Sequence, residues 1–202
     1  MSKVKIIDYK AGNAPSVMHA VRHLGHEAAF ARGPGDLGGA ARIILPGVGS
    51  AGATMRSLRE MNLIEALEEK VLQEKAFFLG ICVGMQILFE HSEEEDTRCL
   101  GWLPGRVARF DAAKVRVPQM GWNEVRFLDG APENYFYFVN SYYACPADER
   151  DVWGLSDYGG EFTAAVHREN IYGSQFHIEK SGEAGLALLQ GFLSLRRGER
   201  PC

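Results

Sequence analysis

The sequence predicts an α/β fold, with an open and mostly parallel central sheet flanked by helices and with antiparallel additions in the second half. Two observations predict it. Short apolar runs alternate with stretches of helical periodicity, which is the pattern of a parallel sheet covered by helices. From about residue 105 to residue 173, aromatic and alternating segments follow one another, which is typical of antiparallel strands. With 202 residues and no recognisable linker, we expect one domain over residues 1–202.

The first predicted elements form a βα unit followed by a second strand. Residues 4–7 are an apolar run that predicts a buried strand, and residues 12–13 predict a turn. A helix follows and ends at Gly25, because glycine commonly stops helices. Its apolar face is formed by Val17, Val21 and Leu24. Another strand is expected near residues 28–30.

The next predicted elements lead to a glycine-rich strand end. A loop rich in glycine and proline covers residues 33–39, and the apolar run 43–45 predicts a strand that enters the sequence Pro-Gly-Val-Gly at residues 46–49. Helical spacing over residues 54–75 then predicts one surface helix. Its apolar face is formed by Leu58, Ile64, Leu67 and Val71.

The remaining predicted elements include the antiparallel half. Residues 77–79 predict a strand, and a helix should follow through Met85, Leu88 and Phe89. The acidic run 93–96 is interpreted as a solvated loop. Further strands are expected at residues 107–110, 135–139 and 162–166, and the last helix is lined by Ala184, Leu188, Gly191 and Leu195.

Composition excludes several classes of protein. The formal charge is −4 and no run of basic residues interleaved with aromatics occurs, so nucleic acid is an unexpected partner. No apolar stretch approaches the roughly 18 residues that span a bilayer. The chain starts directly on a strand pattern without the apolar core of a signal peptide. We therefore expect a cytoplasmic protein without a membrane segment.

The cysteines divide into one of interest and three others. Cys82, Cys99, Cys145 and Cys202 are unevenly spaced and form no Cys-x-x-Cys pair, so we expect free thiols rather than a zinc or redox site. Cys99 and Cys145 are interpreted as small core side chains. Cys202 has no interpretation.

Cys82 has the surroundings of a nucleophile. It lies between a predicted strand and a predicted helix in the pattern Gly-x-Cys-x-Gly, the thiol counterpart of the nucleophile elbow. The tight turn brings the flanking positions close together, so Gly80 and Gly84 would supply room. The start of a helix would also favour the thiolate form. The competing interpretation is a buried cysteine in an ordinary strand-to-helix turn.

A cysteine nucleophile needs a base and a group that orients the base. His177 and Glu179 offer both, because two residues separated by one position on an extended segment project from the same face. An oxyanion hole would complete the site. The backbone N–H of Val83 follows the nucleophile, and the glycine-rich strand end at residues 46–49 could present another. The competing interpretation of this strand end is a plain strand-terminating turn.

These pieces, in this order, resemble the class I (triad) glutamine amidotransferases, whose glutaminase domains carry Gly-x-Cys-x-Gly-x-Gln and a late His-Pro-Glu. The first motif stands here at residues 80–86. Within that class the resemblance is strongest to the glutaminase subunits of imidazole glycerol phosphate synthase. Five blocks carry it, at residues 6–9 with 12–13, 46–49, 117–123, 137–142 and 175–181.

The resemblance implies an activity and a partner. Cys82 would form a glutamyl thioester, His177 would move the proton and Glu179 would orient His177. Residues expected to hold glutamine are Gly49, Gln86, Ser141 and Tyr142, and those expected to donate to the oxyanion are Val48 and Val83. Ammonia would pass to a separate (β/α)₈ cyclase subunit in a heterodimer, contacted by Asn13, Trp122, Asn123 and Lys180. No cofactor or metal is implied.

Some positions depart from the family's pattern. Ile178 replaces the usual proline between histidine and glutamate, so a fixed φ is lost and the geometry of the pair is less constrained. Asn140 and Gln119 each stand where the family usually has histidine, and residues 10–11 differ from the usual small residues. None of these departures touches the nucleophile.

Other interpretations stay open at this point. A paralogue could supply ammonia to another synthase, such as a surface-sugar aminating enzyme. A stand-alone cysteine hydrolase would turn over without a partner, and a regulatory module would lack a working triad. His19, His23 and His26 have zinc-like spacing on a predicted helix, but solvated histidines are the favoured interpretation there.

Overall fold

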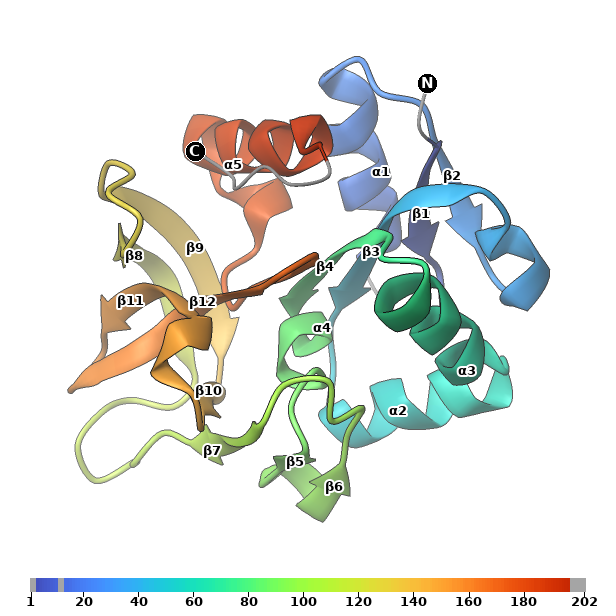
Figure 1. Ribbon diagram of the computed structural model, residues 1–202. Coiled ribbons are helices and arrows are strands. Elements are labelled where there is room, and N and C mark those ends of the chain that lie inside the picture. The colour runs from blue at the N-terminus through green and yellow to red at the C-terminus, as the bar shows by residue number, and fades with distance from the viewer. Residues whose placement is uncertain (1–2, 11–12, 197–202) are drawn as a thin grey trace.

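The computed structural model describes residues 3–10 and 13–196. It shows the mixed α/β architecture expected from the sequence, with a long sheet running through the molecule and helices packed on both faces of its parallel half (Figure 1). Three positions of interest in the sequence, namely Ala11, Gly12 and Cys202, lie outside the described residues.

The parallel half of the sheet places the end of the chain beside Cys82. Its strands run in the order β2 (Ala28–Ala31), β1 (Lys3–Ile7), β3 (Ala40–Gly47), β4 (Phe77–Cys82) and β13 (Ile171–Ser174). Neighbouring strands in this order are all parallel. Strand β13 is the parallel neighbour of β4, so the carboxyl ends of two strands nearly one hundred positions apart in the sequence lie side by side.

The second half of the sheet is mostly antiparallel, as expected. Strand β12 continues from β13, and a β8–β9 hairpin joins through β11 at one side. The strands are β5 (His91–Ser92), β6 (Thr97–Arg98), β7 (Gly105–Arg109), β8 (Gln119–Phe127), β9 (Asn134–Asn140), β10 (Tyr142–Pro146), β11 (Val152–Asp157) and β12 (Glu161–Arg168). Strand β9 passes close to the end of β4, which brings aromatic and polar side chains to the edge where Cys82 lies.

Helices cover both faces of the parallel strands. Helices α1 (Ala14–His23) and α5 (Gly182–Ser194) lie on one face, and α2 (Ala51–Glu60) and α3 (Leu63–Glu68) on the other (Figure 1). Short helical turns are η1 (Pro34–Leu37), η2 (Glu69–Gln73), η3 (Glu94–Asp96), η4 (Glu149–Asp151) and η5 (Ile178–Lys180).

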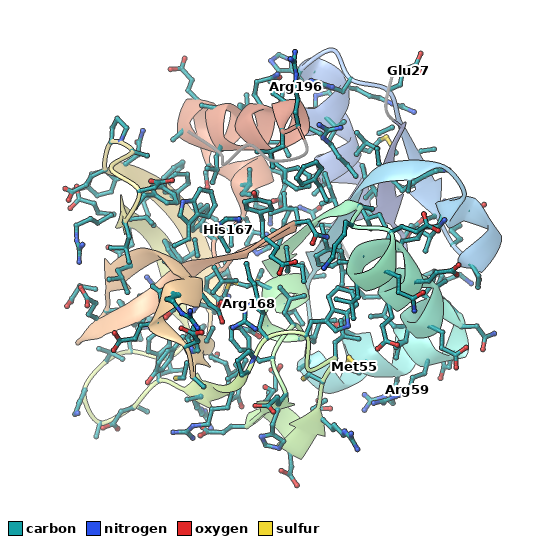
Figure 2. The ribbon with its side chains drawn as sticks, viewed as in Figure 1. Glu27, Met55, Arg59, His167, Arg168 and Arg196 are labelled. Carbon is teal, nitrogen blue, oxygen red and sulfur yellow. The ribbon has the colours of Figure 1, made fainter. Side chains whose placement is uncertain are left out.

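Side chains fill the space between sheet and helices, and the amphipathic character of α2 illustrates how. Met55 and Leu58, one turn apart, are buried, whereas Arg56 and Arg59 are exposed; Figure 2 labels Met55 and Arg59. The buried apolar side chains, which include Cys99, form one continuous core cluster spanning both halves of the sheet. Within the described residues, none of the helices has the length and apolar character required to cross a membrane.

Three helical expectations need correction. The single helix over residues 54–75 is broken at Asn62, whose φ of 55° lies in the left-handed region that asparagine tolerates. The helix after Cys82, α4 (Val83–Gln86), is only one turn long. Its dipole is therefore too short to support the thiolate argument. In α5 the buried face is shifted by one position, to Gly185, Leu189, Phe192 and Leu193.

Candidate active site

Cys82 occupies a strained turn at the end of β4. Its φ of 54° and ψ of −112° are unusual for a residue with a side chain. A Cβ on Gly80 would overlap the carbonyl of Gly84, and a Cβ on Gly84 would overlap the carbonyl of Leu45 in β3. The turn can pack this tightly only with glycine at both positions, so the pattern around Cys82 has a direct steric reason.

His177 and Glu179 lie beside this turn and are hydrogen-bonded to each other. Nδ1 of His177 is 2.9 Å from Oε1 of Glu179, and the two side chains are only 4% and 1% exposed. Asn13 donates to the same carboxylate oxygen at 2.8 Å. With Nδ1 engaged, Nε2 of His177 remains available, and His177 and Cys82 line the same pocket. The structure therefore brings together the three residues singled out in the sequence and adds Asn13 as a fourth.

His177 itself has an extended backbone, but Glu179 lies in the 3₁₀ turn η5 that follows, which corrects the expectation of one extended segment. The Oγ of Ser181 donates to the carbonyl of His177 at 2.6 Å. The backbone N–H of His177 donates to the carbonyl of Tyr137 in β9 at 2.9 Å. Ile178 is buried at 2% exposure. These contacts fix the turn without the proline usual at position 178.

Hydrogen bonding sets the charge state of the pair. Burial lowers the pKa of His177, but hydrogen bonds and charge from Cys82 and Glu179 outweigh burial and raise this pKa to about 9. Burial raises the pKa of Glu179, yet hydrogen bonds from His177 and Asn13 hold it below its usual value. At neutral pH the pair is an imidazolium facing a carboxylate on one side and sulfur on the other.

A pocket of about 320 Å³ opens over Cys82. This volume lies in the range of small-molecule sites. All the residues expected to hold glutamine or to donate to the oxyanion line it. The lining is Val48, Gly49, Cys82, Val83, Gln86, Glu94, Pro118, Val139, Asn140, Ser141, Tyr142, His177 and Lys180.

Glu94 is a pocket residue that sequence reasoning missed. The acidic run 93–96 was expected to be solvated, yet Glu94 lines the pocket and its Oε2 accepts from the backbone N–H of Ala51 at 2.7 Å. Burial raises the pKa of this carboxyl. Only the folded position of the run distinguishes Glu94 from its exposed neighbours, because the four acidic residues look alike in the sequence.

The two histidine-to-amide departures turn out to be one structural feature. Gln119 of β8 and Asn140 of β9 are cross-strand partners, and both are buried. Asn140 donates to the carbonyl of Tyr142 at 3.0 Å and lines the pocket. The replacements are thus neighbours that lie beside the pocket, and neither is Cys82, His177 or Glu179.

Of the four residues expected at a partner interface, two are exposed and two have side-chain hydrogen bonds within the chain. Trp122 is 57% exposed, and Met120 on the same strand is 66% exposed. Lys180 is exposed at the pocket rim. Asn123 donates to the carbonyl of Asp157 at 2.7 Å and so has a role within the fold. The side-chain amide of Asn13 donates to the carboxylate of Glu179, as described above.

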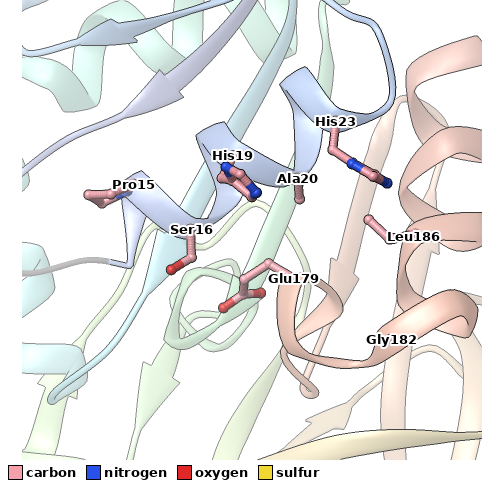
Figure 3. A pocket seen from close by; sticks show the side chains of 8 residues that line it. All are labelled: Pro15, Ser16, His19, Ala20, His23, Glu179, Gly182 and Leu186. Atoms are coloured by element: carbon pink, nitrogen blue, oxygen red, sulfur yellow. The ribbon is translucent and has the colours of Figure 1, made fainter.

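A second hollow, of about 540 Å³, lies between α1 and α5 on the other side of Glu179 (Figure 3). His19 and His23 line it from α1, and Leu186 lines it from α5. Both histidines are exposed. In the described part of the chain, no group of three or more His, Cys, Asp or Glu side chains is arranged to hold a metal ion.

The fold is a mixed α/β fold with Cys82 and His177 in one pocket, and comparisons with known proteins specify the family. The model of the class-I glutamine amidotransferases matches residues 5–194. The HisH subunit of imidazole glycerol phosphate synthase from Aromatoleum aromaticum is 44% identical, covering 96% of this chain and 99% of that protein. The chloroplastic imidazole glycerol phosphate synthase hisHF of Arabidopsis thaliana is 43% identical over 95% of this chain and 34% of that protein.

A solved structure supports the fold independently. The crystal structure of a glutamine amidotransferase superposes with a TM-score of 0.77 at 22% identity, covering 94% of this chain and 96% of that one. The chain belongs to the class-I glutamine amidotransferase family and, within it, to the HisH subunits of imidazole glycerol phosphate synthase.

Proposed function

We propose that Cys82, His177 and Glu179 are the catalytic triad of a glutaminase that passes ammonia to a (β/α)₈ cyclase partner. The chain is the glutaminase subunit of imidazole glycerol phosphate synthase, in histidine biosynthesis. The observation that carries the assignment of residues is that the strained Cys82 and His177 line one pocket, while Glu179 holds His177 by a hydrogen bond to Nδ1.

The proposed reaction proceeds through a thioester. The sulfur of Cys82 attacks the side-chain amide carbon of glutamine, and the imidazolium of His177 gives its proton to the departing nitrogen, which leaves as ammonia. Water then attacks the thioester with His177 as base, and glutamate departs as the sulfur is released. Backbone N–H groups of Val83 and Val48 stabilise the oxyanion in both steps.

The pocket suggests how glutamine is held. Gly49, Gln86, Ser141 and Tyr142 bind it in this proposal, since all line the pocket. Glu94 lies on the same wall and offers a carboxylate that suits the α-ammonium group of an amino acid. Substrate recognition therefore uses side chains from both halves of the sheet.

The proposed partner surface includes one residue of the pocket rim and an exposed aromatic residue of β8. Lys180 is exposed at the rim and would pair with an acidic residue of the cyclase, while Trp122 offers exposed aromatic area of the kind enriched at interfaces. The name of the Arabidopsis relative joins the H and F parts in one protein, which supports close association of the two activities. In this proposal Asn13 and Asn123 lie at the edge of the surface and serve chiefly to hold the fold.

A reconstitution assay tests the proposal. The chain alone should release glutamate from glutamine very slowly, and addition of the cyclase with its nucleotide ligand should raise the rate greatly. We expect this because Gly49, at a φ of 89°, belongs to a strand end that can rearrange to present Val48. The products followed are glutamate, imidazole glycerol phosphate and aminoimidazole carboxamide ribotide.

The outcome separates the alternatives. Full turnover without any partner would favour the stand-alone hydrolase. Activation only by a different synthase would favour the paralogue, and no glutamate under any condition would favour a regulatory module. One domain over residues 1–202 and a cytoplasmic location remain part of the proposal; the continuous core supports the first.

A second prediction concerns pH. Because His177 must be protonated to release ammonia and its pKa is raised to about 9, kcat in the complex should fall as pH rises through about 9. The raised pKa also means that the pair's contribution to stability is complete below the ordinary histidine value of about 6.5 and is lost as pH rises through the folded value. A pH–rate profile at saturating glutamine measures the first effect.

The matched variant for this profile is Glu179→Gln. The amide cannot supply the negative charge that raises the pKa of His177, so the alkaline limb should move to lower pH. An alkaline limb in the same place for both proteins would contradict the assigned charge state.

A further inference from the structure

Gln175 is a buried polar side chain that neither the motif nor the proposed mechanism uses. It lies between β13 and His177 and is 0% exposed. Its backbone N–H donates to the carbonyl of Ala164 in β12 at 2.8 Å, which fixes the start of its side chain. Its side-chain Nε2 lies 3.6 Å from the sulfur of Cys82.

The direction of this hydrogen bond follows from a chain of amides. The carbonyl of Tyr142 can only accept, so the Gln86 atom that lies 3.0 Å from it must be the NH₂ group. This NH₂ group also donates to Oε1 of Gln175 at 3.0 Å. Gln175 must therefore turn its own NH₂ group toward Cys82. The carbonyl of Tyr142 therefore sets the orientation of both side-chain amides, first that of Gln86 and through it that of Gln175.

The sulfur consequently has separate partners for its two charge states. The carbonyl of Val139, 3.9 Å away, can accept from the thiol. The N–H of Gln175 can only donate, so it stabilises negative charge on sulfur. Negative charge forms on the sulfur before attack on the amide and again when the thioester breaks, so the same hydrogen bond serves both half-reactions.

We propose that Gln175 is a further catalytic residue, which donates a side-chain hydrogen bond to the reacting sulfur of Cys82 and is held in that orientation by Gln86. The inference rests on the proposed glutaminase function. It adds a second group that stabilises negative charge on the sulfur, and Gln86 then helps to hold the thiolate as well as lining the glutamine pocket.

The test compares Gln175→Met with Gln190→Met. Both exchanges replace an amide with a thioether of similar length, but Gln190 lies on α5 and its side chain donates to the Oγ of Ser194 at the surface. The first readout is the rate of Cys82 alkylation by iodoacetamide as a function of pH, measured by mass spectrometry of the Cys82 peptide. Burial raises the pKa of Cys99 to about 11 and that of Cys145 above its usual value, so neither thiol should compete.

The expected result is specific to the buried position. In Gln175→Met the midpoint of the alkylation profile should move upward by about one pH unit, as expected for loss of a hydrogen bond to the charged form. In the complex, kcat should fall by roughly 10-fold or more while KM for glutamine stays within about threefold. Gln190→Met should match the wild-type chain in both assays.

Gln175→Glu provides a second variant that keeps more of the buried network. Its carboxylate still accepts from Gln86 but offers the sulfur no N–H and adds negative charge, so the midpoint should again move upward. An unchanged alkylation profile in either folded variant would overturn the proposal, even if kcat fell. Alkylation needs no partner and no turnover, so failure of the wild-type chain to make glutamate even in the complex with the cyclase and its nucleotide would reject the proposed function separately.

Discussion

Replacing Cys82 with alanine should abolish glutamine-dependent synthesis by the complex, with a loss on the order of 10⁴-fold or more, as removal of a triad nucleophile typically gives. The reason is chemical. Without sulfur the amide carbon of glutamine has no nucleophile in the pocket, while the buried His177–Glu179 pair still forms. The measurement is imidazole glycerol phosphate formation with glutamine as the nitrogen source.

The same variant should keep synthesis from added ammonium salts, because the cyclase then receives ammonia from solution. This arm is the control for folding and for assembly, since it requires an intact partner complex but no thioester. Loss of both activities together would contradict the division of labour between a glutaminase and a cyclase. Retention of glutamine-dependent synthesis would remove Cys82 from the mechanism.

The sequence predicted the parts of this site that follow from local pattern. The glycines around Cys82 predicted a strained turn, and the structure gives the reason in the close approach of Gly80, Gly84 and Leu45. The alternation of apolar runs predicted the mixed sheet. In both cases a short-range steric or hydrophobic constraint is visible in a few neighbouring residues.

The parts that could not be predicted depend on contacts between distant segments. Asn13 donates to Glu179 across 166 positions of sequence, and Gln175 reaches Cys82 across 93. In the sequence nothing distinguishes Glu94 from its acidic neighbours, and only the folded structure shows that it lines the pocket. The geometry of His177 was expected from an extended segment, whereas the structure achieves it with a 3₁₀ turn. Such pairings follow from strand order, which local pattern does not determine.

Gly84→Ala should damage the enzyme without changing any group that takes part in the chemistry. The added Cβ would overlap the carbonyl of Leu45, and backbone of the central sheet cannot move aside as a flexible side chain can. We expect a loss of about 2–3 kcal/mol in the free energy of unfolding, typical of overpacking in a dense core. Because the strained turn sets the position of the sulfur, glutamine-dependent activity should fall further than stability alone explains, by roughly 10²-fold.

The matched control is Gly191→Ala in α5. A Cβ there meets nothing within 4 Å, and the position is inside a helix, so alanine should raise stability by about 0.5–1 kcal/mol. Thermal unfolding and alkylation of Cys82 separate the two causes of lost activity. If Gly84→Ala unfolds at a lower temperature but its folded form reacts with iodoacetamide like the wild-type chain, the turn contributes stability only. A slower reaction of the folded variant would show that the close packing of β3 against the turn positions the nucleophile.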